Sequence, residues 1–214
     1  NEEDALVPQR IHDVLPQIEK AVKKIIEALN QEGRLFYIGS GTSGRLGILD
    51  AVECPPTFST TNEVNGIIAG GPSAFVKAKE GAEDHEDDGQ REIMEAGICD
   101  KDVVVGIAAS GRTPHTIGAL KQANKIGAYT ISIACNPDSE IGKVAKLAID
   151  MNLGPEVITG STRLKAGTAQ KLVLNMLSTA SMVGIGKTYQ NLMVDLKPSN
   201  EKLVERSKRI IMEA

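Results

Sequence analysis

Apolar residues recur every three or four positions between Val7 and Asn30, which is the spacing of one face of an α-helix. Polar residues occupy most positions between them, and Gly33 follows as a typical helix stop. The pattern predicts one amphipathic helix near the start of the chain. Two further helical patterns lie near its end, at 162–187 and 201–214.

Five short apolar runs lie between these helical segments, at 34–39, 64–69, 103–108, 128–134 and about 147–152. Gly, Ser, Asn or Pro follows each run, and helical patterns separate most of them, as in a parallel sheet with helices on both faces. The pattern predicts an α/β fold, a three-layer sandwich whose five-stranded parallel sheet is flanked by helices. We expect an N-terminal helical arm at 1–33, a sheet domain at 34–190, and the start of a C-terminal helical region at 191–214.

Composition limits the choice of partners and surroundings. The 214 residues, 41 % hydrophobic and 24 % charged, are enough for one globular domain with a sizeable core. A formal net charge of −4 provides no basic field, so we expect no nucleic acid and no membrane as partner. The apolar stretch at 172–186 is shorter than the roughly 20 residues of a membrane span. Three scattered cysteines are typical of a reducing compartment, so we expect a cytoplasmic protein.

The first strand is followed by GSGTSGRLG at 39–47, which contains the pattern G-x-G-x-x-G. A dinucleotide site also needs an acidic residue at the end of the second strand, but that strand ends in glycines at 70–71. The hydroxyls of Ser40, Thr42 and Ser43 instead lie just before a helix, where hydroxyls and free N–H groups suit a phosphate. The same residues are also compatible with a tight turn in which Thr42 or Ser43 is the helix N-cap.

Two other loops carry the same chemistry. Ser110, Gly111 and Thr113 follow the third strand, and Ser161 and Thr162 open the long C-terminal helix. Loops at the carboxyl ends of adjacent parallel strands can enclose one ligand. We therefore expect a small phosphorylated ligand rather than a polymer.

These motifs carry a family resemblance. S-G-x-T-x-x-T at 110–116, G-T-S at 41–43 and E-x-x-x-x-S-T at 156–162 resemble the sugar isomerase (SIS) domain, a phosphosugar-binding α/β fold. GPEVITGSTRLKAGTAQK at 154–171 is similar to the signature shared by N-acetylmuramic acid 6-phosphate etherases and the glucokinase regulatory protein. SGRLGILDAVECPPTF and EGAEDHEDDG resemble the etherases in particular. The resemblance covers nearly all of the chain, and we expect the family's further sequence at both ends to be missing here.

The resemblance implies a lyase that removes D-lactate from N-acetylmuramic acid 6-phosphate, by elimination and then water addition, in cell-wall sugar recycling. It implies no cofactor and no metal, and the three histidines are far apart in sequence. It also implies Glu53 as proton donor and Glu83 as second catalytic carboxylate. The implied substrate-binding residues are Ser40, Thr42, Ser43, Ser110, Gly111, Thr113, Glu156, Ser161 and Thr162. We further expect a homodimer, because the apolar 172–186 stretch and the N-terminal helix offer more hydrophobic surface than five strands must cover.

The residues themselves leave the carboxylates open. Pro55 and Pro56 predict that the helix carrying Glu53 ends there, close to the first phosphate loop. Glu83 lies in an acidic run that also fits a solvated face, and Glu156 is compatible with a base or with a partner of sugar hydroxyls or backbone. Two other functions share the phosphate loops: a non-enzymatic regulator resembling the glucokinase regulatory protein, and an aldose-ketose phosphosugar isomerase.

Overall fold

The computed structural model describes residues 1–195 and 201–213, and within them five strands form one parallel sheet in the order β2-β1-β3-β4-β5. At the carboxyl end of β1, Gly39 is paired with Ile68 of β2 and Ile107 of β3. The sheet confirms the predicted α/β fold. The strands are β1 (Leu35–Gly39), β2 (Val64–Ile68), β3 (Val103–Ile107), β4 (Tyr129–Ala134) and β5 (Leu147–Asp150).

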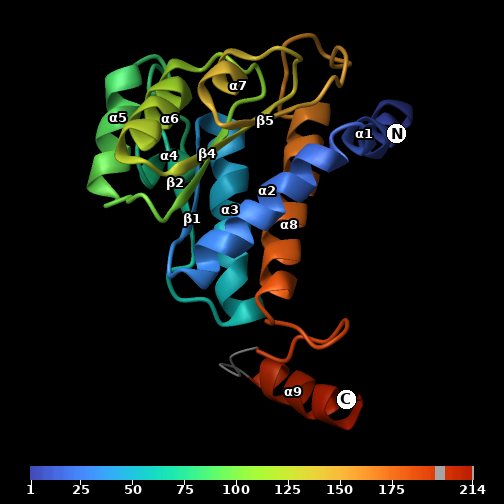
Figure 1. The fold of residues 1–214 in the computed structure, drawn as a ribbon. Helices are drawn as coiled ribbons and strands as arrows, with labels where there is room; N and C mark the ends of the chain where they lie inside the picture. The colour runs from blue at the N-terminus through green and yellow to red at the C-terminus, as the bar shows by residue number, and fades with distance from the viewer. Residues whose placement is uncertain (196–200, 214) are drawn as a thin grey trace.

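Helices cover both faces of this sheet, as Figure 1 shows. The layer on one face is built by α2, α3 and α8, and the layer on the other by α5, α6 and α7. The described helices are α1 (Glu2–His12), α2 (Leu15–Asn30), α3 (Gly41–Phe58), α4 (Ser73–Val76), α5 (Glu86–Glu95), α6 (Pro114–Ile126), α7 (Glu140–Val144), α8 (Lys165–Gly184) and α9 (Glu201–Glu213).

Strand side chains alternate between two apolar cores. In β1, Leu35 and Tyr37 belong to the core beneath α2, α3 and α8, whereas Phe36 and Ile38 belong to the core beneath α6. All five residues of β1 are buried, because helices cover both faces of the sheet. This double burial explains why β1 and β3, both buried throughout, read as continuous apolar runs rather than as alternating ones.

The N-terminal arm differs from the prediction, because two helices replace the single one. The chain leaves the helix after His12, and α2 begins at Leu15 with Pro16 in its first turn, where a missing N–H needs no partner. Val14, at the break, is buried, as are Ile11 of α1 and Ile18 of α2. The apolar spacing therefore continues across the break, and spacing alone could not reveal it.

The end of α3 also differs from the prediction. Pro55 and Pro56 lie inside the helix, which continues to Phe58 instead of ending near Glu53. Each proline lacks an N–H, but both lie in the last turn, so few helical hydrogen bonds are lost. The helix ends in a left-handed cap, in which the Ser59 N–H donates to the Pro55 carbonyl oxygen. Glu53 consequently lies on the exposed surface of a long helix, about 18 Å along the axis from Gly41 at a rise of 1.5 Å per residue.

The C-terminal helices fall within their predicted segments. α8 occupies the inner part of 162–187, and α9 coincides with the helix predicted at 201–214, of which residue 214 lies outside the described residues. α9 lies beyond the end of α8, apart from the sheet (Figure 1). Residues 196–200 also lie outside the described residues, and the boundaries 1–33, 34–190 and 191–214 stay predictions.

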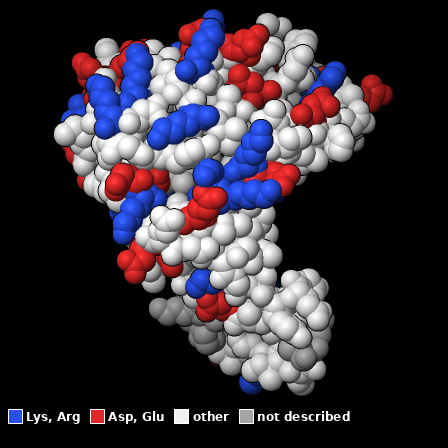
Figure 2. All heavy atoms as spheres, in the orientation of Figure 1, with Lys and Arg blue, Asp and Glu red and all other residues white. Residues whose placement is uncertain are grey.

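Acidic and basic side chains lie interspersed over the upper part of the face drawn in Figure 2. Across residues 1–195 and 201–213, no helix combines the length and the apolar character needed to cross a bilayer.

Candidate active site

The first loop joins β1 to α3 through closely packed backbone. A Cβ on Gly44 would lie 2.5 Å from the Gly39 carbonyl oxygen, so only glycine lets the helix start approach the strand end. Ser40, not Thr42 or Ser43, occupies the N-cap position, and its side chain makes no capping bond. The Ser40 hydroxyl is buried and has no hydrogen-bond partner among the described residues, while the Ser43 hydroxyl donates to Gln170 Oε1 of α8 (3.0 Å). The Ser40 hydroxyl is therefore a buried donor that no described group engages.

The second loop lies beside the first, because β1 and β3 are neighbours in the sheet. Gly111 has φ +73°, and a Cβ there would lie 2.5 Å from Ser139 Cβ, so the turn needs glycine. Ser110 is exposed and its hydroxyl accepts from the Arg112 N–H (3.3 Å). Thr113 is the N-cap of α6 and makes no side-chain capping bond. The serine and threonine hydroxyls of this loop thus lie at the carboxyl edge of the sheet, as predicted.

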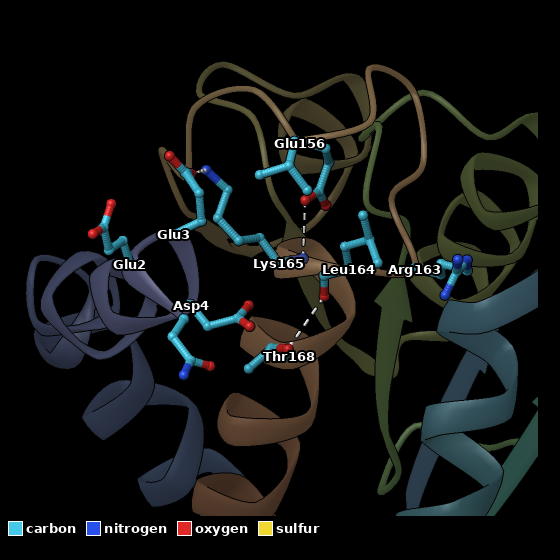
Figure 3. A pocket seen from close by; sticks show the side chains of 10 residues that line it. Glu2, Glu3, Asp4, Glu156, Arg163, Leu164, Lys165 and Thr168 are labelled. Atoms are coloured by element: carbon cyan, nitrogen blue, oxygen red, sulfur yellow. Dashed lines mark hydrogen bonds and ion pairs between the residues drawn. The ribbon is translucent and has the colours of Figure 1, made fainter.

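The third loop leads into α8 and is organised by Glu156. Its carboxylate accepts from the backbone N–H groups of Lys165 and Ala166, both at 3.0 Å, and so caps the helix. Figure 3 shows the bond to Lys165. A Cβ on Gly167 would lie 3.7 Å from Thr42 Cγ2, so the first turn of α8 borders the first loop. Of the roles compatible with Glu156 in the sequence, the structure therefore shows backbone hydrogen bonding.

Lys165 ties this loop to the N-terminal arm. Its side chain is buried, and its ammonium pairs with the carboxylate of Glu3 in α1 at 2.5 Å. In Figure 3 the Lys165 side chain extends toward Glu3, whereas Arg163 points the other way. A cavity of about 660 Å³ lies around this pair. Its charged lining residues are Glu2, Glu3, Asp4, Glu156, Arg163 and Lys165.

Glu83 lies next to the first loop. A second cavity, of about 200 Å³, is lined by Ser40 and Gly41 together with the segment that follows β2, including Lys79, Glu80 and Glu83. A hydrogen bond fixes the Glu83 backbone: its carbonyl oxygen accepts from the His115 N–H at the start of α6 (3.1 Å). The structure thus brings a carboxylate and a phosphate-type loop into one pocket.

Glu53 is not among the residues that line this pocket. Its place three turns along α3 separates it from Glu83 within one chain. Leu49, Val52 and Glu53 are all exposed, and with Pro56 they form one stripe along the outer face of α3, here called the α3 stripe.

One histidine and two cysteines are buried, whereas His12, His85 and Cys99 are exposed. His115 is fully buried and its Nε2 lies 2.9 Å from Glu92 Oε2, so it is not a surface histidine. Burial raises the pKa of the Cys54 and Cys135 thiols to about 12, which keeps both uncharged at neutral pH. In the part of the chain that the structure describes, no group of three or more His, Cys, Asp or Glu residues could hold a metal ion.

Comparison with known proteins decides the family. Residues 17–124 match the family described as glucokinase regulatory protein N-terminal SIS domain, and residues 79–180 match the SIS domain. An N-acetylmuramic acid 6-phosphate etherase of Bacillus cereus (strain AH187) is 61 % identical over the whole chain, which covers 73 % of that protein. This chain belongs to the N-acetylmuramic acid 6-phosphate etherase family.

Solved structures share the fold of this etherase-family chain. Phosphoheptose isomerase from Neisseria gonorrhoeae has a TM-score of 0.64 at 17 % identity and covers 84 % of this chain and 93 % of its own. The Vibrio vulnificus NanR protein complexed with ManNAc-6P has a TM-score of 0.56 at 14 % identity, covering 98 % of this chain and 67 % of its own.

Two basic residues that line the pocket of Ser40 and Glu83 were not predicted from the sequence, Arg45 and Lys79. Arg45 donates to the carbonyl oxygens of Phe75 (2.8 Å) and Ala74 (2.9 Å), so it fixes α4 against α3. Lys79 donates to the Gly70 carbonyl oxygen. Their signal in the sequence is their place in segments that follow the carboxyl ends of β1 and β2, where ligands bind in parallel sheets.

Proposed function

We propose that this chain is a carbon-oxygen lyase that converts N-acetylmuramic acid 6-phosphate to N-acetylglucosamine 6-phosphate and D-lactate, in cell-wall sugar recycling. The family membership supports the reaction, and the observation that carries the site is the pocket shared by Ser40 and Glu83. The free cysteines fit a cytoplasmic enzyme.

The phosphate is proposed to bind among the three hydroxyl loops. Ser40 offers an unengaged buried hydroxyl, and Ser110 and Thr113 lie beside it at the end of β3. Thr42, Ser43, Gly111, Ser161 and Thr162 complete the proposed set, and Glu156 holds the start of α8 in place beside them. Helix N-termini and hydroxyl donors favour a dianion without a broad basic surface.

Two proton transfers define the reaction. A base takes the C2 proton of the open-chain sugar, which the C1 aldehyde acidifies, and the C3–O bond breaks as an acid protonates the ether oxygen. D-Lactate leaves, and the product is an unsaturated aldehyde. Water then adds at C3 while C2 regains a proton. The net reaction consumes one water and uses no redox equivalent. Glu83 and Glu53 are the proposed pair.

Within one chain, Glu53 lies three turns along α3 from the pocket that contains Glu83. The two carboxylates can therefore act on one substrate only across an interface between two copies. The α3 stripe supports such an interface: Leu49 and Val52, 45 % and 56 % exposed, flank Glu53 on an apolar outer surface. A homodimer that covers this stripe would carry Glu53 of one copy toward the pocket of the other. We therefore propose a homodimer whose sites are completed by the partner.

The test is incubation of the enzyme with N-acetylmuramic acid 6-phosphate, followed by assay of free D-lactate. Lactate release is expected. A 2-ketose product without lactate would indicate an isomerase, and tight binding without any product would indicate a regulator. Glu83→Gln and Glu53→Gln should each lower turnover by roughly 10² to 10⁴ while leaving binding of the phosphate nearly unchanged. Normal lactate release in both variants would place the chemistry elsewhere and make Glu156 the next residue to test.

A further inference from the structure

The substrate of the proposed reaction carries two anions, and the hydroxyl loops account for only one of them. The second is the carboxylate of the lactyl group, which lies close to the C3–O bond that breaks. A carboxylate placed beside Glu83 and Glu80 would be repelled unless a cation lies between them. The pocket contains two basic side chains, Arg45 and Lys79.

The contacts separate these two candidates. Arg45 directs its Nε and Nη2 groups to backbone carbonyl oxygens of α4, so its fork is engaged in holding that helix. The Lys79 ammonium has three donors, and the Gly70 carbonyl oxygen accepts from it. Within the described residues neither cation forms an ion pair, but Arg45 is held by two carbonyl oxygens and Lys79 by one, so the Lys79 ammonium turns more readily toward an anion. Its charge is thus available to an incoming anion.

Gly70 shows that the Lys79 side chain has a defined place. Gly70 has φ +85°, and a Cβ on it would lie 2.9 Å from Lys79 Cδ and 3.2 Å from Ala82 Cβ. The lysine stem therefore lies across the bare backbone of Gly70, directly after β2. This packing places the ammonium near the carboxyl end of β2. Lys79 and Glu83 belong to the same short segment after that strand and line the same pocket.

We propose that Lys79 binds the lactyl carboxylate and thereby distinguishes the substrate from its sugar phosphate product. The inference rests on the proposed function, because it takes the lactyl ether as substrate. It assigns a binding role rather than a proton transfer. An ammonium at this place also draws the carboxylate of the leaving group away from Glu83, which keeps the Glu83 carboxylate free for its proton transfer.

The experiment compares two ligands that differ in the lactyl group. In a Glu83→Gln background, so that substrate survives the titration, Lys79→Met should weaken binding of N-acetylmuramic acid 6-phosphate about 10- to 100-fold by calorimetry. Binding of N-acetylglucosamine 6-phosphate, which lacks the carboxylate, should change less than about twofold. Lys77→Met is the matched control, because Lys77 is exposed on the same segment but does not line the pocket.

A modified substrate keeps the test independent of folding. When the lactyl carboxylate is converted to an amide, the affinity of the Glu83→Gln protein, which retains Lys79, should fall by the same factor as the Lys79→Met change causes. Lys79→Met should then cause no further loss of affinity for the amide. Equal weakening of both sugar phosphates, or unchanged binding of the lactyl substrate, would overturn the inference. Absence of lactate release from the unmodified enzyme would refute the proposed function instead, since these titrations require no turnover.

Discussion

Asp50 shows how a single buried carboxylate can govern the interface behind the site. It lies on the inner face of α3, and its Oδ1 accepts from Asn175 Nδ2 (2.8 Å) and Ser178 Oγ (3.1 Å) of α8. Its Oδ2 is buried without a hydrogen-bond partner among the described residues. Burial raises the pKa of Asp50, and the hydrogen bonds from α8 only partly oppose this.

The raised pKa predicts a pH-dependent stability. Between the unfolded pKa, about 3.9, and the higher folded pKa, the native state binds more protons than the unfolded chain, so stability falls as pH rises. Asp50→Asn keeps an acceptor and cannot ionise, so its stability relative to the parent should increase from about pH 4 to pH 7. Asp50→Ala leaves two donors unpaired and should cost about 1–3 kcal/mol. Urea unfolding at both pH values measures this, and a pH-independent difference for Asp50→Asn would contradict it.

At the scale of elements, burial decided which predictions succeeded. The central strands β1 and β3 were predictable because a run such as Val103–Ile107 is buried on both faces and must be apolar throughout. The C-terminal end of α3 was not predictable. The expectation that proline ends a helix considers the missing N–H groups of Pro55 and Pro56, but not the tertiary packing that buries Cys54 and Phe58.

The candidate site was predictable only in part. The hydroxyl loops follow from glycines at strand ends, so their position at one edge of the sheet could be inferred. The separation of Glu53 from Glu83 depends on helix length, and the engagement of Ser43 by Gln170 joins residues far apart in the chain. Neither leaves a local signal.

The contact between α5 and α6 makes a prediction about glycine. A Cβ on Gly118 would lie 2.0 Å from the Glu86 carbonyl oxygen, so the two helices must separate to admit it. Gly118→Ala should destabilise the fold by about 1–3 kcal/mol, although alanine favours a helix. Gly167→Ala in α8 is the matched control, because its nearest contact is 3.7 Å, and it should stabilise by about 0.5–1 kcal/mol. Equal denaturation midpoints for the two variants would disprove the packing argument.

At the scale of the whole molecule, the Glu3–Lys165 pair holds the N-terminal arm against the start of α8. Glu3→Ala would leave the buried Lys165 ammonium without its carboxylate and should cost about 1–3 kcal/mol of unfolding free energy. Lys165→Met should be nearly neutral, because an apolar chain of similar length fills the same space. Glu2→Ala is the control, since Glu2 is exposed on the same turn. Similar decreases in the free energy of unfolding, measured by thermal unfolding, for Glu2→Ala and Glu3→Ala would rule out a specific stabilising role of the Glu3–Lys165 pair.

The proposed homodimer should be visible in solution. Leu49 and Val52 expose apolar surface on the α3 stripe, and association would remove it from water. Sedimentation at micromolar concentration is expected to give twice the mass of one chain. Val52→Lys places a charge within this surface and should shift the equilibrium toward monomer, whereas a monomeric parent protein would contradict the proposal.

The strongest test of the assembly combines two inactive variants. If Glu53 of one copy serves the pocket that contains Glu83 of the other, Glu53→Gln and Glu83→Gln homodimers are each inactive, but a mixed dimer has one intact pair. Mixing the two after mild dissociation should therefore restore about a quarter of the parent's lactate release per chain, as expected for random exchange in a two-fold dimer. Mixing either variant with a Glu53→Gln, Glu83→Gln double variant provides the control, because those dimers contain no intact pair. Restored activity in the first mixture alone establishes a shared site. No recovery, with subunit exchange verified by mass spectrometry, would mean that the two carboxylates do not act together across the interface.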